Sequence, residues 1–166
     1  MEKRRFLNGS KARLAFFIVL SFAVLLTLCF IWGNSFLGQS ASGSGSGRVY
    51  VKIAKPVFDF LFGVNSVSHE AFRKIAHGAE FMLLGFNLCG LFATINAGFN
   101  EKTYLKILPL GFYVAFLDET IQIFTGREPQ IKDVWIDFGG YVAALALSFL
   151  VFVIVRAIKK KKNKKA

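Results

Sequence analysis

The stretch FLDETIQIFTGREPQIKDVWIDFGG, residues 116–140, places charged side chains between two apolar runs that are each long enough to cross a membrane. Its polar side chains include Asp118, Glu119, Gln122, Arg127, Lys132, Asp133 and Asp137. An ionised carboxylate costs about 2.5–3.5 kcal/mol at the centre of a bilayer on insertion scales, and less near the surface. We therefore expect these groups to gather near one membrane surface and to face one another.

Four segments of the 166-residue chain have the length and composition of membrane spans. A span needs roughly 20 predominantly apolar residues, and 54% of the residues in this chain are hydrophobic. The predicted spans cover about residues 14–32, 75–96, 104–124 and 134–156. The sequence thus predicts an all-α membrane protein with four transmembrane helices that form a single domain, residues 1–166.

The distribution of basic residues predicts that both termini are cytoplasmic. Of the 21 Lys and Arg residues, fourteen fall on the side of the termini and seven on the other side, and cytoplasmic loops carry the excess. The basic tail 157–166 then lies inside. The first apolar run, about 19 residues, exceeds the roughly 7–15 residues of a signal peptide, so we expect it to be retained as a span. Nucleic acid is not an expected partner, because the basic residues flank spans and lack interleaved aromatic residues.

The long connection between the first two spans, residues 33–74, is predicted to lie outside. Its part GQSASGSGSG, residues 38–47, has the composition of a flexible, exposed linker. The following part, VYVKIAKPVFDFLFG, residues 49–63, is rich in apolar side chains but too short to span a bilayer. We predict a short interfacial or re-entrant segment there.

With this topology, the polar ends of the second, third and fourth spans lie on the outer side. Residues three or four apart share a face of a helix. This spacing relates Lys74, His77 and Glu80 in the second span, Asp118 and Gln122 in the third, and Asp133 and Asp137 in the fourth. The sequence therefore predicts a polar pocket at the outer-leaflet end of these three spans.

The residue types of the predicted pocket suit several kinds of chemistry. His77, Asp118 and Glu119 are candidate catalytic residues, since imidazole and carboxyl groups transfer protons. The candidate substrate-binding residues are Lys74, Glu80, Gln122, Arg127, Asp133 and Asp137. Among them, Arg127 can hold a phosphate or carboxylate with two parallel hydrogen bonds. No cofactor is expected. A histidine with several carboxylates also suits a divalent cation, but the spacing matches no metal signature, so this question stays open.

Two motifs in this part of the chain resemble those of a known family. KIAHGAEFMLLG, residues 74–85, fits K-x-x-H-x-x-x-[FY]-x-x-L-G, and residues 118–140 fit D-E-x-x-Q-x-F, a loop Arg, and D-x-x-x-[ND]-x-x-G. The serine-rich stretch at residues 34–50 is also similar. Together, over about residues 15–150, the chain resembles the VanZ-like family of small bacterial membrane proteins, named for a teicoplanin-resistance protein. Asp137 departs from the family pattern, which more often has Asn there.

The resemblance implies a bacterial plasma membrane and an association with glycopeptide antibiotic resistance of the teicoplanin type, but no reaction. Three functions stay open. The chain is a binding or resistance factor for a membrane lipid or a lipid-linked cell-wall precursor, or an intramembrane enzyme that acts on the head group of such a lipid. As a small transporter or flippase, it would need to form a homo-oligomer, because four spans are few for transport.

Overall fold

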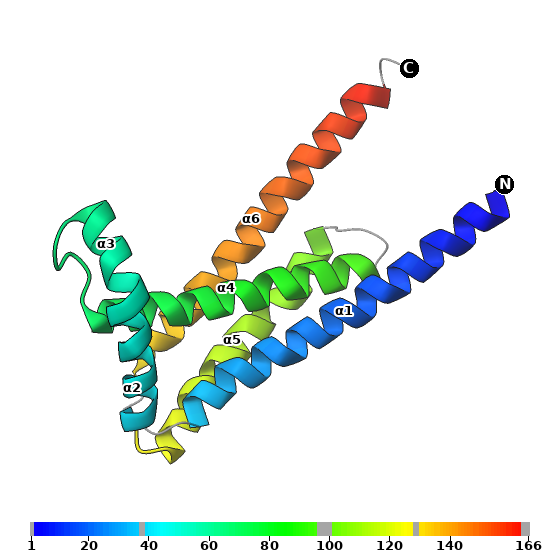
Figure 1. Cartoon of the computed structure of the whole chain (residues 1–166). Helices are drawn as coiled ribbons and strands as arrows, with labels where there is room; N and C mark the ends of the chain where they lie inside the picture. Colours follow the sequence, from blue (N-terminus) through cyan, green and yellow to red (C-terminus); the bar gives the residue numbers. More distant parts are fainter. Residues whose placement is uncertain (1, 37–38, 96–100, 128–129, 164–166) are drawn as a thin grey trace.

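The computed structural model is helical over nearly all the residues that it describes, which are 2–36, 39–95, 101–127 and 130–163. The elements are α1 (Glu2–Phe36), α2 (Gln39–Val49), a short π-helix η1 (Tyr50–Ala54), α3 (Lys55–Phe62), α4 (His69–Ile95), α5 (Glu101–Phe124) and α6 (Ile131–Asn163). In Figure 1, α2 and α3 lie near one end of the bundle that the long helices α1, α4, α5 and α6 form. The predicted all-α fold class is confirmed.

Four stretches of these helices are long and apolar enough to cross a membrane: Lys11–Phe36, His69–Ile95, Lys102–Phe124 and Ile131–Ile158. This confirms the prediction of four transmembrane helices and makes the chain a multi-pass membrane protein. The start of α1 and the end of α6 lie toward the same side of the bundle (Figure 1), as an even number of spans requires. Which side is cytoplasmic remains a prediction.

The helix ends nearest the polar residues are defined by local signals. Ser68 begins α4 as its N-cap, because its Oγ accepts a hydrogen bond of 3.1 Å from the backbone N–H of Ala71. At the end of α5, Gly126 has a positive φ of 71°, and the N–H of Arg127 returns to the carbonyl oxygen of Gln122 at 3.2 Å. This is the Schellman type of helix end, in which glycine avoids the strain of the left-handed conformation. It fixes the position of Arg127.

Small residues allow α4 and α6 to cross closely. A Cβ atom on Gly140 would collide with the backbone carbonyl of Gly78, and one on Gly85 would lie 2.7 Å from the Cβ of Ala144. Close backbone approach of this kind replaces the hydrophobic driving force that is missing between helices in lipid. Gly139, next to Gly140, faces open space. The crossing holds the polar ends of α4 and α6 next to each other.

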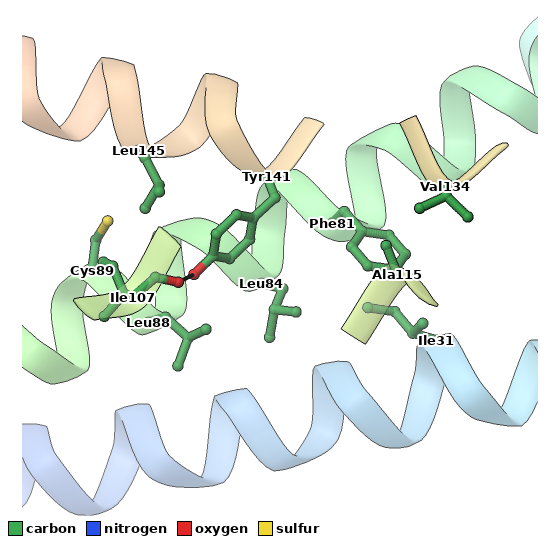
Figure 2. Packing of buried hydrophobic residues seen from close by; sticks show 10 residues of the cluster. All are labelled: Ile31, Phe81, Leu84, Leu88, Cys89, Ile107, Ala115, Val134, Tyr141 and Leu145. Carbon is green, nitrogen blue, oxygen red and sulfur yellow. Dashed lines mark hydrogen bonds between the residues drawn. The ribbon is translucent and has the colours of Figure 1, made fainter. Parts of the chain in front are cut away.

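A layer of buried apolar residues surrounds the crossing. Tyr141 of α6 is fully buried at its centre, and Figure 2 shows its ring among side chains such as Leu84 and Leu145. The Tyr141 hydroxyl donates a hydrogen bond of 2.7 Å to the carbonyl oxygen of Ile107 in α5. The one polar atom of this large side chain therefore has a partner, as burial in an apolar layer requires.

The glycine- and serine-rich stretch after the first span differs from its prediction. Over the residues that the structure describes, Gln39–Val49 is the helix α2 and not a flexible linker. Glycine and serine are poor helix formers, so contacts with the start of α4 offset their low propensity. Ser46 Oγ and His69 Nε2 are 3.1 Å apart, and the Tyr50 ring packs against Phe72. The membrane placement of the short helix α3, predicted as interfacial or re-entrant, remains a prediction.

Candidate functional site

Polar side chains gather at the end of the bundle where α1 and α5 end and α4 and α6 begin. They form a narrow cavity, here called the polar pocket, which is lined by Arg73, Lys74, His77, Glu119, Gln122, Arg127, Asp133, Ile136 and Asp137. Its volume is about 10 Å³, which corresponds to roughly one water molecule. The pocket is therefore too small for an organic molecule and large enough for a single water or ion.

A second cavity, here called the side cavity, adjoins the polar pocket. It is lined by Phe30, Asn34, Gly45, Ser46, Val49, Phe72, Arg73, Ala76, His77 and Glu80, from α1, α2 and α4, and has a volume of about 300 Å³. This volume is at the lower end of the range for small-molecule sites. Arg73 and His77 line both cavities. A group in the side cavity would thus lie next to the polar pocket.

The structure brings the nine predicted site residues to one end of the bundle, although not into one cavity. Seven of them line the polar pocket: Lys74, His77, Glu119, Gln122, Arg127, Asp133 and Asp137. Glu80 lines the side cavity instead. Asp118 lines neither cavity and is fully buried. One of its carboxylate oxygens nevertheless lies within 4.8 Å of ligand atoms of His77 and Asp137. The individual roles of these residues remain predictions.

Asp118 is held by hydrogen bonds to both of its carboxylate oxygens. Ser35 Oγ of α1 donates to Oδ1 at 2.7 Å, and Gln122 Nε2 donates to Oδ2 at 3.0 Å. Gln122 Nε2 also donates to Glu119 Oε1 at 2.9 Å, so one amide bridges two carboxylates. The backbone N–H of Gln130 donates to Glu119 Oε2 at 2.9 Å, which ties α5 to the start of α6. These bonds fix the orientation of both carboxylates.

His77, Asp118 and Asp137 form the most closely spaced group of titratable side chains here. Each offers one ligand atom, and all of these atoms lie within 4.8 Å of one another. Asp137 is only 1% exposed. Its Oδ1 and His77 Nδ1 are buried and have no hydrogen-bond partner among the described residues. Such buried polar atoms are uncommon and call for an explanation, for example an ion or a water molecule.

Basic side chains form the other part of the polar pocket. Lys74 Nζ lies 3.2 Å from Glu70 Oε1 and 3.9 Å from Asp133 Oδ1. Arg127 is 8% exposed, and burial, followed by the nearby charge of Arg73, lowers the pKa of its guanidinium below its ordinary value. Guanidinium groups stay protonated in proteins. A guanidinium has five N–H donors, of which Nη1 makes a weak bond of 3.5 Å to the carbonyl oxygen of Asn34.

Two residues of α1 complete the site and were not among the predicted site residues. Asn34 Nδ2 donates to Glu80 Oε1 at 3.4 Å, and Ser35 binds Asp118. Thr125 Oγ1 donates to the carbonyl oxygen of Ser35 at 3.0 Å and so joins α5 to α1. A signal for them exists in the sequence, because a first span that starts inside must end on the side where the polar ends of the other spans lie.

Comparison with known proteins agrees with the resemblance of the motifs. The sequence model of a family described as VanZ/LLP1 matches residues 16–154 of the chain, which include all the residues of the polar pocket. No curated protein and no solved structure matches the chain.

Proposed function

Since this chain belongs to the VanZ-like family, we propose that it contributes to glycopeptide resistance of the teicoplanin type in the plasma membrane of a bacterium. In this proposal, the site binds the anionic head group of a membrane lipid or a lipid-linked cell-wall precursor in the outer leaflet. Both termini are then cytoplasmic, as the distribution of Lys and Arg residues favours. The name of the family supplies the link to antibiotic resistance.

The observation that carries the proposal is the placement of Arg73 in the wall shared by the two cavities, with Arg127 in the adjoining polar pocket. Arg73 lines both cavities, and the buried guanidinium of Arg127 makes one weak side-chain bond among the described residues, to Asn34. Guanidinium groups bind phosphate with parallel, charge-assisted hydrogen bonds. A phosphate head group in the side cavity would therefore meet basic donors, while its acyl or prenyl chain stays among the apolar side chains of Phe30 and Phe72.

A second candidate function follows from His77 and the nearby acids. Since the ligand atoms of His77, Asp118 and Asp137 lie within 4.8 Å of one another, they are close enough to pass a proton between them through one water. His77 also lines the side cavity. An enzyme that acts on the bound head group, with His77 as the acid or base, is the alternative that this geometry favours.

The test is drug susceptibility in a sensitive Gram-positive host. We expect wild type to raise the minimal inhibitory concentration of teicoplanin, and Arg127→Gln to remove most of this protection at equal abundance in the membrane. Lys132→Gln is the matched control, because it removes one positive charge from an exposed position near the same end of the bundle. It should protect as wild type does.

Each outcome of this assay is informative. If wild type gives no protection, the proposed link to resistance is wrong for this chain. If Arg127→Gln protects fully, resistance does not depend on an anion bound at Arg127. If protection depends on Arg127, mass spectrometry of the host lipids decides between binding and catalysis. Only an enzyme changes the lipid head groups. In that case the change should be lost when His77 is substituted.

A further inference from the structure

We infer that His77, Asp118 and Asp137 bind one divalent transition-metal cation of the Zn²⁺ type. This inference does not depend on the proposed function, because it concerns the chain without drug or lipid. The three residues come from α4, α5 and α6, and their ligand atoms lie within 4.8 Å of one another. Zinc sites commonly use three protein ligands from imidazole and carboxylate groups and leave a further position for water or substrate.

The unpartnered atoms give independent support for a ligand at this position. Asp137 is 1% exposed, and its Oδ1 has no hydrogen-bond partner among the described residues. His77 Nδ1 is also a buried atom without a hydrogen-bond partner among the described residues. Because a buried polar atom without a partner costs about 1–3 kcal/mol, such atoms on two residues of one closely spaced group are best explained by a species that both residues contact. A cation accepts lone pairs from an imidazole nitrogen and a carboxylate oxygen at once.

The charges around the group favour a cation over a water molecule. Asp118, Glu119 and Asp137 are all buried, yet the ion pairs within 4.0 Å among the described residues include none of the three. Buried charges are normally paired or coordinate metals. A divalent cation between Asp118 and Asp137 would give both carboxylates a positively charged partner in direct contact.

The surroundings of the group resemble the support that metal ligands usually have. Metal-binding carboxylates are oriented by further hydrogen bonds, and Asp118 receives them from Ser35 and Gln122. The polar pocket, which His77 and Asp137 line, has room for one water-sized species. Zinc bonds of about 2.0–2.2 Å place tetrahedral ligand atoms roughly 3.4 Å apart, so small side-chain rotations would close the group around the ion.

The type of metal follows from the donor atoms. Imidazole suits Zn²⁺, Fe²⁺, Ni²⁺ and Cu²⁺, whereas Mg²⁺ and Ca²⁺ prefer sites made of oxygen atoms alone. A site of one imidazole and two carboxylates should therefore bind Zn²⁺ more tightly than Mg²⁺ or Ca²⁺. This order also separates the site from nonspecific attraction of cations to an acidic surface, which would not discriminate against Mg²⁺ and Ca²⁺.

The test is metal analysis of the purified chain in detergent, prepared without a polyhistidine tag and washed with chelator. After equilibration with Zn²⁺ and dialysis, we expect about one Zn²⁺ per chain by mass spectrometry of the metal content. His77→Gln and Asp137→Asn should each weaken binding at least about tenfold, since each removes a ligand. An excess of Mg²⁺ or Ca²⁺ should not displace the bound Zn²⁺.

Two variants serve as matched controls. His69→Gln removes the other histidine of the chain, which lies on α4 and contacts Ser46 of α2. Asp59→Asn removes an acid that is bound to Lys55 at 2.7 Å. Both should bind Zn²⁺ as wild type does. The inference is overturned if folded wild type holds no stoichiometric Zn²⁺, or if His77→Gln and Asp137→Asn both bind it with unchanged affinity.

Discussion

The polar pocket and the layer around Tyr141 are neighbouring parts of the same four-helix bundle, and they treat buried polar groups in opposite ways. In the Tyr141 layer the buried hydroxyl has a partner, the carbonyl oxygen of Ile107, and the side chains around it are apolar. At the polar end Asp118, Asp137 and Arg127 are buried, and Asp137 Oδ1 lacks a partner among the described residues.

This difference separates residues that stabilise the bundle from those that are retained at a cost to stability. A satisfied polar group in a well-packed layer contributes to a unique structure. Buried, incompletely paired ionisable groups in a membrane protein are expensive and mark functional sites by default. We therefore expect substitutions in the Tyr141 layer to lower stability, whereas some substitutions at the polar end leave stability intact and remove function.

The largest effect is expected at the crossing of α4 and α6, on which both regions depend. Gly140→Ala adds a Cβ atom that collides with the backbone carbonyl of Gly78, and backbone cannot rotate away as a side chain can. Overpacking typically costs about 1–3 kcal/mol and occasionally more, and we expect the upper end of this range or loss of the folded protein. Thermal melting in detergent and abundance in the membrane measure the effect.

Gly139→Ala is the control for Gly140→Ala, since it makes the same chemical change on the next residue of α6. A Cβ atom on Gly139 meets nothing within 4 Å, so this variant should melt at or slightly above the temperature of wild type. If Gly140→Ala and Gly139→Ala melt at the same temperature, the close crossing is wrong and the two regions are not held together in this way.

The sequence predicts at which end of the helices the site lies. It predicts less well which side chains contact one another there. Apolar runs and charge positions are enough to locate four spans and to place Asp118 and Asp137 at the same end of the bundle. Spacing on one helix gives a shared face, but not how that face is rotated toward another helix. For this reason the bond from Ser35 to Asp118, between residues 83 positions apart in the chain, was not predictable from spacing.

The division of the site into two cavities shows the same limit. Glu80 lies one turn from His77 on α4, and spacing alone assigns both to one pocket. In the structure Glu80 faces Asn34 of α1 and lines only the side cavity, whereas His77 lines both. The wall formed by α2 was also missed, because glycine and serine predict no helix and their contacts with α4 are tertiary.

A moderate loss of stability is expected from Tyr141→Phe, which tests the satisfied polar group. The variant keeps the ring in the layer and leaves the Ile107 carbonyl without the hydroxyl bond of 2.7 Å. A hydrogen bond of this kind contributes about 0.5–1.5 kcal/mol, so the free energy of unfolding in mixed micelles should fall by that amount.

Tyr113→Phe controls for removal of a tyrosine hydroxyl, because Tyr113 is 64% exposed on α5. It should unfold as wild type does. An equal loss of stability in Tyr113→Phe and Tyr141→Phe would mean that the buried hydrogen bond does not stabilise the fold. The Tyr141 layer would then not differ from the polar end in the way described.

The smallest effect on stability is expected from Asp137→Asn, measured in the same micelles with chelator present. Asp137 Oδ1 has no hydrogen bond to lose among the described residues, and the substitution replaces a buried carboxyl group near Asp118 by an amide of the same shape. His77 and Asp118 offer acceptor atoms within 4.8 Å to the new amide. The free energy of unfolding should thus stay within about 0.5 kcal/mol of wild type or rise, as at other sites where function limits stability.

A loss as large as that of Tyr141→Phe would mean that Asp137 is a structural residue. Unchanged stability with lost Zn²⁺ binding would instead show that the two neighbouring regions bury polar groups for different reasons.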